Sequence, residues 1–235
     1  MKNEKISFIG GGNMALAIAS GLVQCGRVKS SDITIYEISK ERREKLIGLG
    51  FNAVANAAML GQSRITFLAV KPAHAKEALE QYAQSVCTCD SCVSIIAGIS
   101  AKEISRMLLD KFKVIRIMPN TPAMVGAGMT QYCCNSLVTE ENERHFLSLM
   151  AHTGHVDKLE EGLIDAASAL SGCGPAYMYL FLEGLADGAV ACGIPRAKAY
   201  EYAAATMEGA AKLMLTAGQH PGQLKDAVCS PGGST

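Results

Sequence analysis

Short runs of β-branched and aromatic residues alternate with longer helical patterns over the first two-thirds of the chain. The runs predicted as strands are Lys5–Ile9, Asp32–Tyr36, Arg64–Val70, Ser91–Ile96 and Val114–Met118. The segments predicted as helices between them are Asn13–Gln24, Ser39–Leu49, Ala73–Val86 and Ser100–Leu109. Such alternation is typical of parallel strands joined by helical crossovers, which place a ligand crevice at the carboxyl ends of the strands. We therefore expect an α/β fold with a doubly wound, mostly parallel sheet of the Rossmann type.

The pattern changes after about Asp157, because no further β-rich run occurs and Ala, Gly and Leu dominate. The segment Ala176–Cys192 is apolar on nearly all sides apart from Glu183 and Asp187. A helix with so little polar surface must be covered on several sides, so we expect part of the cover to come from another subunit. The sequence predicts a first domain over residues 1–157 and an all-α domain for oligomerisation and substrate binding over residues 158–235.

Charge and cysteine content exclude several classes of protein. The 22 basic and 22 acidic side chains cancel, which argues against nucleic acid as a partner. The stretch Ala166–Leu182 is too polar for a membrane span, so no membrane partner is expected. Nine Cys is an odd number, and Met1–Lys5 carries charges of both signs, unlike a signal peptide. These features favour a reduced, cytoplasmic chain.

A glycine-rich segment follows the first predicted strand directly, with the sequence Gly10-Gly11-Gly12-Asn13-Met14-Ala15. It fits the dinucleotide-binding fingerprint between a strand and a helix. Gly10 allows the tight turn, Gly12 lets the backbone approach a pyrophosphate, and Ala15 keeps the helix close to the sheet. A glycine-rich turn that binds nothing is the alternative.

Glu37 lies one residue past the second predicted strand, where a carboxylate can accept hydrogen bonds from the adenosine ribose. A carboxylate there also repels a 2′-phosphate, so the charge balance favours NADH. Lys40, Arg42 and Arg43 follow closely, however, and could bind that phosphate, so NADPH stays open. A solvated acid at a strand end is the alternative.

Three further strand ends carry turn-forming or small residues. The first has the sequence Ala69-Val70-Lys71-Pro72, the second is Ala97-Gly98, and the third spans Met118–Pro122 with two Pro. Each alone is compatible with an ordinary turn. Their convergence at one sheet edge favours a single crevice in which a flat ring lies against the backbone.

Two segments of the helical part favour a small polar ligand. Ser168, Ser171 and Gly172 share one helix face by their spacing, and Pro175 lacks the N–H that would bond the Ser171 carbonyl and is expected to kink the helix. The segment Ser230–Thr235 has the composition of a turn with free N–H groups and hydroxyls, which suits a carboxylate. A purely structural kink and a flexible tail are the alternatives.

The motifs IGGGNM, LAVKP, AGIS, RIMPNTP, SGCGPAY, LADG and SPGGST occur in this order. This combination resembles pyrroline-5-carboxylate reductase over essentially the whole chain. The resemblance implies an oxidoreductase of proline biosynthesis, which passes hydride from NADH or NADPH to the C=N carbon of Δ1-pyrroline-5-carboxylate and gives L-proline.

The resemblance also implies site residues. The dinucleotide would be held by Gly10, Gly11, Gly12, Asn13, Met14, Ala15, Asn56, Ala69, Val70, Lys71, Pro72, Ala97 and Gly98, together with Glu37 from the pattern above. The substrate would be held by Glu161, Ser168, Ser230, Gly232, Gly233, Ser234 and Thr235, together with Ser171 from the helix face above. We expect Thr235 to be catalytic, orienting the imine nitrogen. Cys173 and Ala227 depart from the family pattern and receive no role.

The resemblance further implies a homodimer, which can assemble into a ring of dimers, and one or two further helices after the SPGGST segment. Two alternatives remain: a related reductase for another small imine or β-hydroxyacid, and a dinucleotide-binding sensor without turnover.

The remaining cysteines and histidines favour structural roles. Cys87, Cys89 and Cys92 lack the spacing of a zinc site, so no metal is expected. His145, His152 and His155 are expected on a helix and at its end, where they cap or pack.

Overall fold

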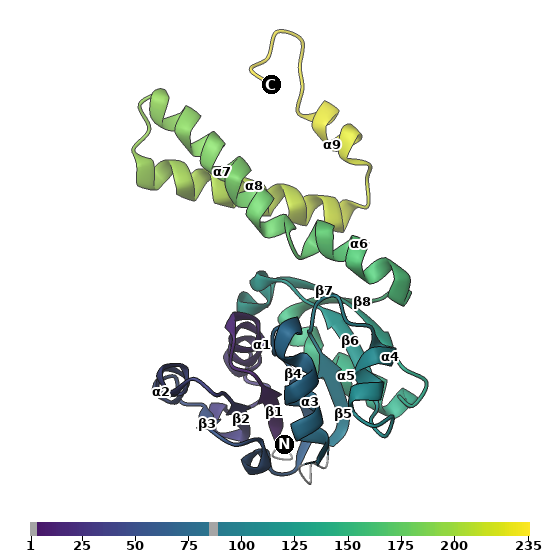
Figure 1. The fold of residues 1–235 in the computed structure, drawn as a ribbon. Coiled ribbons are helices and arrows are strands. Elements are labelled where there is room, and N and C mark those ends of the chain that lie inside the picture. The colour runs from purple at the N-terminus through teal and green to yellow at the C-terminus, as the bar shows by residue number, and fades with distance from the viewer. Residues whose placement is uncertain (1–3, 85–88) are drawn as a thin grey trace. The chain divides into compact units, whose positions relative to one another are not determined.

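In the computed structural model, residues 4–84 and 89–235 are described, and the chain divides into two compact units, Met1–Pro175 and Ala176–Thr235 (Figure 1). The strands are β1 (Ile6–Ile9), β2 (Ile33–Tyr36), β3 (Asn52–Val54), β4 (Ser63–Leu68), β5 (Cys89–Ser94), β6 (Val114–Met118), β7 (Gly128–Cys134) and β8 (Gly154–Lys158). The helices are α1 (Asn13–Gln24), α2 (Lys40–Gly48), α3 (Ala75–Gln84), α4 (Ala101–Met107), α5 (Glu140–Met150), α6 (Glu161–Ser171), α7 (Gly174–Ala191), α8 (Arg196–Ala217) and α9 (Pro221–Ala227).

The first unit contains one sheet with the strand order β3-β2-β1-β4-β5-β6-β7-β8. The strands β1 to β6 pair in parallel, β7 runs antiparallel to β6, and β8 runs parallel to β7. The strand order reverses at β1 and β4, and the crevice of a doubly wound sheet lies at that point. The predicted fold class is therefore confirmed, and the carboxyl ends of β1 to β6 lie along one edge.

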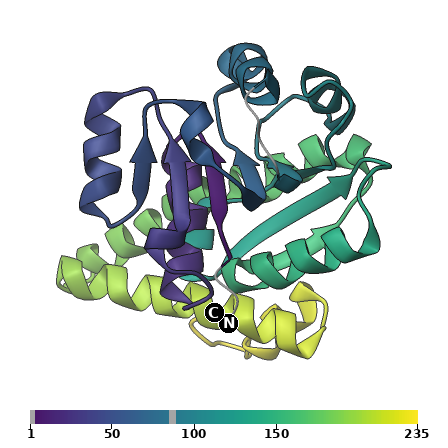
Figure 2. The same ribbon diagram turned by 90° about the horizontal axis from the view of Figure 1, so that it is seen from below.

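Two apolar clusters cover the two faces of this sheet. One cluster joins the strands to α1, α2 and α5, and in it the rings of Phe8 and Phe67 stack with centroids 4.7 Å apart. The other cluster joins the strands to α3, α4 and α6. Figure 2 shows α3 and α4 on one side of the strands and α5 on the other. Because the central strands are buried on both faces, their sequences are nearly continuous apolar runs.

Side-chain caps begin several of these helices. Ser39 caps α2 through its hydroxyl, which accepts the N–H of Arg42. Ser100 and Glu103 form a reciprocal capping box at α4, and Thr139 and Asn142 form another at α5. Each box satisfies two N–H groups that the helix itself leaves without partners.

The structure corrects three expectations. The sequence patterns did not predict β3, β7 or β8, and His155 lies in β8 rather than on a helix or at its end. Pro175 does not kink one helix, because α6 ends at Ser171 and α7 begins at Gly174. Pro175 therefore stands in the first turn of α7, where its missing N–H costs no helical hydrogen bond.

The second unit consists of most of α7, together with α8, α9 and the segment Ser230–Thr235. Gly218, in the left-handed region, ends α8, and His220 caps α9 through Nδ1, which accepts the N–H of Gly222. Among residues 4–84 and 89–235, no helix combines the length and apolar character that crossing a bilayer requires.

Residues 159 and 160 lie between the end of β8 and the start of α6, close to the predicted domain boundary. By contacts alone, however, α6 belongs to the first unit. The division at residue 157 stays a prediction.

A buried ionic cluster ties the start of the chain to α5, and it generates a prediction about acid stability. Glu4 accepts a hydrogen bond from His145 and pairs with Arg27 at 3.1 Å. The hydrogen bond from His145 holds the pKa of Glu4 below its ordinary value of 4.5. The stabilisation from this carboxylate is therefore complete above that value and is lost as the pH falls through the lower, folded-state pKa.

We expect Glu4→Gln to lower the free energy of unfolding near neutral pH by about 1–3 kcal/mol, because Arg27 loses the negative charge of its partner. The difference in the free energy of unfolding between the variant and the parent protein should shrink in acid, where Glu4 is protonated. Denaturant titrations across the acid range measure this difference. Glu44→Gln, at an exposed pair with Lys40, is the control, with a change below about 0.5 kcal/mol. A deficit that is as large in acid as at neutral pH would contradict this account.

Candidate functional site

The turn after β1 brings two backbone segments into contact at the reversal point of the sheet. Gly10 donates its N–H to Tyr36 O and has φ of 96°, in the left-handed region. A Cβ on Gly10 would lie 2.6 Å from Ala69 O, in the segment after β4. Only glycine fits this position, because both the φ angle and the close approach exclude a side chain. The contact brings the Gly10–Ala15 and Ala69–Pro72 segments together, as the sequence predicts.

The start of α1 is suited to an anion. Gly12 is its N-cap residue, no side chain caps the helix, and its first turn holds no acidic residue. A Cβ on Gly12 would meet only Arg42 Nη1, at 3.8 Å, so the space above the turn is open except for a positive charge. The free N–H groups and helix dipole fit the pyrophosphate of a dinucleotide.

Glu37 is a buried acid with two backbone partners. Its Oε2 accepts the N–H of Gly11 at 3.0 Å, and its Oε1 accepts the N–H of Ser39 at 2.8 Å. The carboxylate therefore shapes the glycine-rich turn, and its charge stays at the place where an adenosine ribose is expected. This geometry is more specific than a solvated acid at a strand end.

Not all of the basic residues after Glu37 are free to bind a 2′-phosphate. Arg43 donates through Nη1 to the carbonyls of Glu37 and Ile38, both at 2.8 Å, and Lys40 lies 4.0 Å from Glu44. Arg42 is exposed next to Gly12. Of the three cations that could bind a 2′-phosphate, Arg42 has the most favourable position.

The other predicted cofactor residues also follow parallel strands. Asn56 follows β3 and caps a 3-10 turn (Ala57–Leu60) by accepting the N–H of Ala58. Lys71 and Pro72 begin a second 3-10 turn (Pro72–His74) after β4, and Ala97 and Gly98 are exposed after β5, with Gly98 at φ of 70°. The predicted dinucleotide segments therefore share one edge of the sheet.

The predicted substrate residues of α6 lie next to this edge, and some have partners within the protein. Glu161 Oε1 accepts the N–H of Ala101 at 2.6 Å and lies 3.5 Å from Arg116. The Ser171 hydroxyl has two acceptors at 3.0 Å, Ala167 O and Gln131 Oε1, which share its one proton. A Cβ on Gly172 would lie 2.8 Å from Ser168 O, so glycine is required there.

The segment Ser230–Thr235 forms a tight turn. Gly233 donates its N–H to Ser230 O at 2.9 Å, with Pro231 and Gly232 between them and Gly232 at φ of 73°. This is the arrangement of a type II turn. A Cβ on Gly233 would lie 2.5 Å from Ser230 Oγ. Ser234 and Thr235 follow, with exposed side chains. The predicted turn is therefore present.

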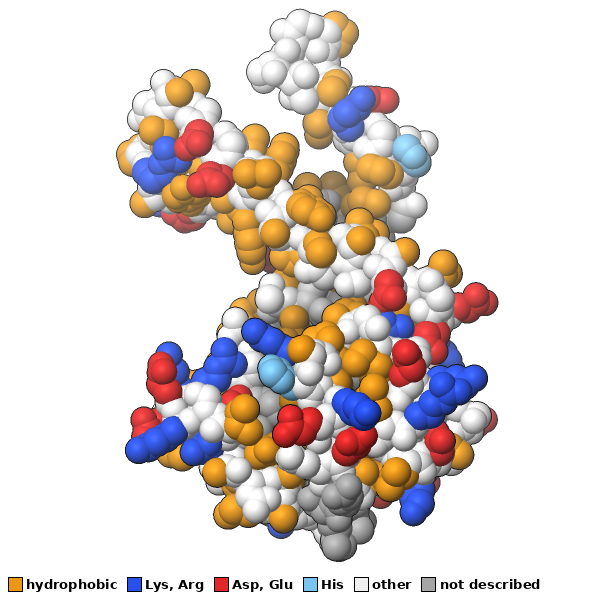
Figure 3. All heavy atoms as spheres, viewed as in Figure 1, with side chains coloured by type: hydrophobic (Ala, Val, Ile, Leu, Met, Phe, Trp, Pro, Cys, Tyr) orange, Lys and Arg blue, Asp and Glu red, His pale blue; other side chains and the backbone are white. Residues whose placement is uncertain are grey.

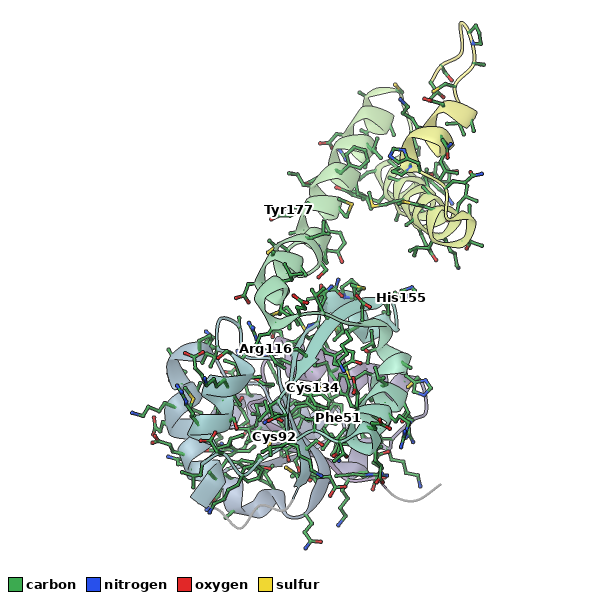
Figure 4. The ribbon with its side chains drawn as sticks, turned by 90° about the vertical axis from the view of Figure 1, so that its right-hand side faces the viewer. Phe51, Cys92, Arg116, Cys134, His155 and Tyr177 are labelled. Carbon is green, nitrogen blue, oxygen red and sulfur yellow. The ribbon has the colours of Figure 1, made fainter. Side chains whose placement is uncertain are left out.

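The structure adds polar residues that the sequence analysis did not single out. Arg116 projects from β6 to Asp165 of α6, with 2.6 Å between Nη2 and Oδ1 (Figure 4). Asn120 and Gln131 are buried and bond Ser171. One signal was available, because an Arg within the apolar run of β6 must be paired.

The cysteines of β5 lie at the opposite edge of the sheet. Cys89 begins this strand, its Sγ lies 3.6 Å from Cys92 Sγ, and Tyr82 donates to it. The hydrogen bond with Cys92 lowers the pKa of Cys89 to about 7. Cys87 lies outside the described residues, and no group of metal-binding side chains occurs among those described.

A doubly wound sheet with an open glycine-rich first turn defines an NAD(P)-dependent oxidoreductase. Comparisons with known proteins agree. Residues 5–98 match the family model described as "NADP oxidoreductase coenzyme F420-dependent", and residues 161–235 match that described as "Pyrroline-5-carboxylate reductase dimerisation".

Individual relatives cover nearly the whole chain. The pyrroline-5-carboxylate reductase of Escherichia coli is 42% identical over 99% of this chain and 87% of its own length. Pyrroline-5-carboxylate reductase 3 of Danio rerio is 39% identical over 98% of this chain and 81% of its own length. The crystal structure of Plasmodium falciparum pyrroline carboxylate reductase with NADP bound aligns over 99% of this chain and 87% of that chain, with a TM-score of 0.88 and 31% identity. The chain belongs to the pyrroline-5-carboxylate reductase family.

The close approach at Gly10 generates a prediction. We expect Gly10→Ala to weaken NADPH binding by at least about tenfold and to lower stability, since the Cβ must displace the backbone of Ala69. Gly26→Ala is a matched control, because Gly26 also has a left-handed φ (71°) but no atom within 4 Å of its Cβ.

The control should lose only about 1–2 kcal/mol of stability and keep its affinity. Fluorescence titration with NADPH and thermal unfolding give the two quantities. Equal NADPH affinity in both variants would show that the approach at Ala69 does not shape the nucleotide site.

Proposed function

We propose that this chain catalyses the reduction of the C=N bond of Δ1-pyrroline-5-carboxylate to L-proline with NADH or NADPH. The observation that carries this proposal is the convergence of the predicted dinucleotide segments on one sheet edge, in a chain 42% identical to a reductase of that name. When bound, the reduced nicotinamide supplies the hydride.

The protein's own residues bind the dinucleotide and orient its nicotinamide ring. The free N–H groups of α1 hold the pyrophosphate, Asn56 and the backbone of Ala69–Pro72 line the nucleotide, and Ala97-Gly98 leave room for the flat ring. Glu37, fixed by Gly11 and Ser39, accepts from the ribose and favours NADH over NADPH. Arg42 next to Gly12 keeps NADPH as a second substrate.

The substrate is held by polar groups of α6 and of the carboxy-terminal turn. The N–H groups and hydroxyls of Ser230, Gly232, Gly233 and Ser234 bind its carboxylate, while Ser168 and Ser171 flank the ring. A cyclic imine is partly protonated near neutral pH, so its carbon is already electrophilic. The enzyme therefore needs no strong acid, and Thr235 orients the imine nitrogen. Glu161 acts through Arg116 and Ala101, next to the substrate.

The active unit is a homodimer, which can assemble into a ring of dimers. Figure 3 shows hydrophobic side chains along the helices of the carboxy-terminal unit. On α7, Tyr179 is 63% exposed, Leu180 71% and Phe181 60%, and exposed apolar side chains gathered in this way mark a protein–protein interface. The match of residues 161–235 to a dimerisation domain supports this assignment.

We assign the enzyme to the cytoplasm. Cys25, Cys173, Cys192 and Cys229 are exposed and form no disulfide, which suits a reducing compartment.

The activity assay tests the function directly. The purified chain should oxidise NADH and NADPH only when pyrroline-5-carboxylate is present, with the higher kcat/KM for NADH. Glu37→Gln should shift that ratio toward NADPH by about tenfold, because it removes the charge that repels the 2′-phosphate. Nucleotide binding without oxidation would identify a sensor, and turnover with only another imine would identify a different reductase.

The role of Thr235 has its own test. Thr235→Val keeps the shape but removes the hydroxyl, so we expect kcat to fall by about 100-fold or more, within the usual range for a group that guides proton transfer. NADPH affinity, measured by fluorescence titration, should stay within about twofold of the parent protein. Thr216→Val is the control, since the Thr216 hydroxyl bonds Lys212 O within α8. Unchanged turnover in Thr235→Val would remove this role.

A further inference from the structure

Three buried polar side chains of β6, β7 and the loop between them hold α6 at both of its ends. Arg116 is 3% exposed, Asn120 7% and Gln131 5%, although the neighbouring strand residues are mostly apolar. Burying polar groups at these positions is costly unless each finds a partner. The partners they find include four groups of α6, so we define Arg116, Asn120 and Gln131 as the α6 clamp.

Arg116 fixes the beginning of α6. Its guanidinium bonds Asp165 at 2.6 Å and lies 3.5 Å from Glu161, one turn earlier on the same helix face. Glu161 also accepts the N–H of Ala101, at the start of α4. The first turn of α6 is thereby connected to the segment that directly follows Ala97-Gly98.

Asn120 fixes the end of α6. Its Nδ2 donates to the carbonyl of Ser171 at 2.9 Å, and its Oδ1 accepts the N–H of Met129 at 2.9 Å. A continuous helix would supply that carbonyl with the N–H of residue 175, but Pro175 has none. Asn120 therefore replaces the missing helical donor and ties the end of α6 to the carboxyl edge of the sheet.

Gln131 completes the clamp from β7. Its Oε1 lies 3.0 Å from the Ser171 hydroxyl, next to the carbonyl that Asn120 holds. The carbonyl of Ser171 is thus bonded to Asn120, and its hydroxyl is bonded to Gln131. These two bonds fix the turn that carries Ser168, Ser171 and Gly172 relative to the strand ends.

We propose that Asn120 is a positioning residue for the imine substrate, acting through Ser171, an inference that rests on the proposed function. Hydride transfer requires the reacting carbon to lie within about 3–3.5 Å of the donor, and a misplacement of about 1 Å can lower the rate by about 100-fold. A helix end held to the loop after β6 meets that requirement. None of the clamp residues lies in the segments after β1 and β2, which hold the pyrophosphate and the adenosine ribose, so loosening the clamp is expected to weaken imine binding more than nucleotide binding.

The test compares Asn120→Asp with Asn135→Asp. Asn120→Asp keeps the acceptor for Met129 but places a carboxylate oxygen against the Ser171 carbonyl. Asn135 is a matched control at the other end of β6, because its Oδ1 accepts the N–H of Val114 and its Nδ2 donates to Phe112 O. Both substitutions replace one backbone-binding amide by a carboxylate of the same size.

We expect Asn120→Asp to lower kcat/KM for pyrroline-5-carboxylate by at least about tenfold, with a raised KM, and to leave the NADPH Kd within about twofold. Asn135→Asp should leave both constants within about twofold at a similar loss of Tm. Amide hydrogen exchange should be faster at the end of α6 in Asn120→Asp alone.

Two results would overturn the positioning role: an unchanged kcat/KM in Asn120→Asp, or an equal loss in Asn135→Asp. Should Asn120→Asp fail to fold, Asn120→Ala removes the donor to the Ser171 carbonyl without adding a charge and should lower kcat/KM by about tenfold, and no change there would also overturn the proposal. Failure of the parent protein to turn over pyrroline-5-carboxylate contradicts the proposed function instead and is seen before any variant is made.

Discussion

At the carboxyl edge of the sheet, the backbone of Gly10 lies against the carbonyl of Ala69 at a distance that no β-carbon allows. This contact joins the ends of β1 and β4, the two strands between which the winding of the sheet reverses. Because of it, the turn into α1 is tight, the first N–H groups of α1 face open space, and Gly11 meets the carboxylate of Glu37. The proposed nucleotide site follows from one steric constraint and the common direction of the strands.

The proposed substrate side, which includes α6, depends on a different kind of interaction. Its helix, α6, is short and amphipathic, with Ile164 as its buried residue, so apolar packing alone fixes it weakly. Charged and amide side chains from the sheet supply the remaining contacts, each directed at a particular atom. Buried polar contacts of this kind add little net stability but discriminate strongly between arrangements, which is what a site for a small ring requires.

A buried thiol lies near these groups on β7. Burial and the nearby Glu161 carboxylate raise the pKa of Cys133, on β7, to about 11. The thiol therefore stays protonated and unreactive at neutral pH, as a buried structural cysteine does.

Most of the sheet could be predicted from sequence because its inner strands are buried on both faces and bounded by Gly, Pro or small residues. The strands β1, β2, β4, β5 and β6 were all predicted, with ends displaced by two residues at most. The strand β3 is too short for a pattern, β7 contains Thr130 and Gln131 among its inward residues, and β8 is largely exposed. The fingerprint residues could be found because their geometry is local. The α6 clamp could not, since the partners of Arg116 and Asn120 are about 50 residues away along the chain.

Isotope transfer tests the central claim most directly. The reaction is run with NADPH that carries deuterium on the transferred position of C4, and the proline formed is analysed by mass spectrometry and NMR. The account predicts that one deuterium appears at C5 of proline for each NADPH oxidised, because hydride passes directly from the ring to the imine carbon. Proline without deuterium, or NADPH oxidation without proline, would contradict it.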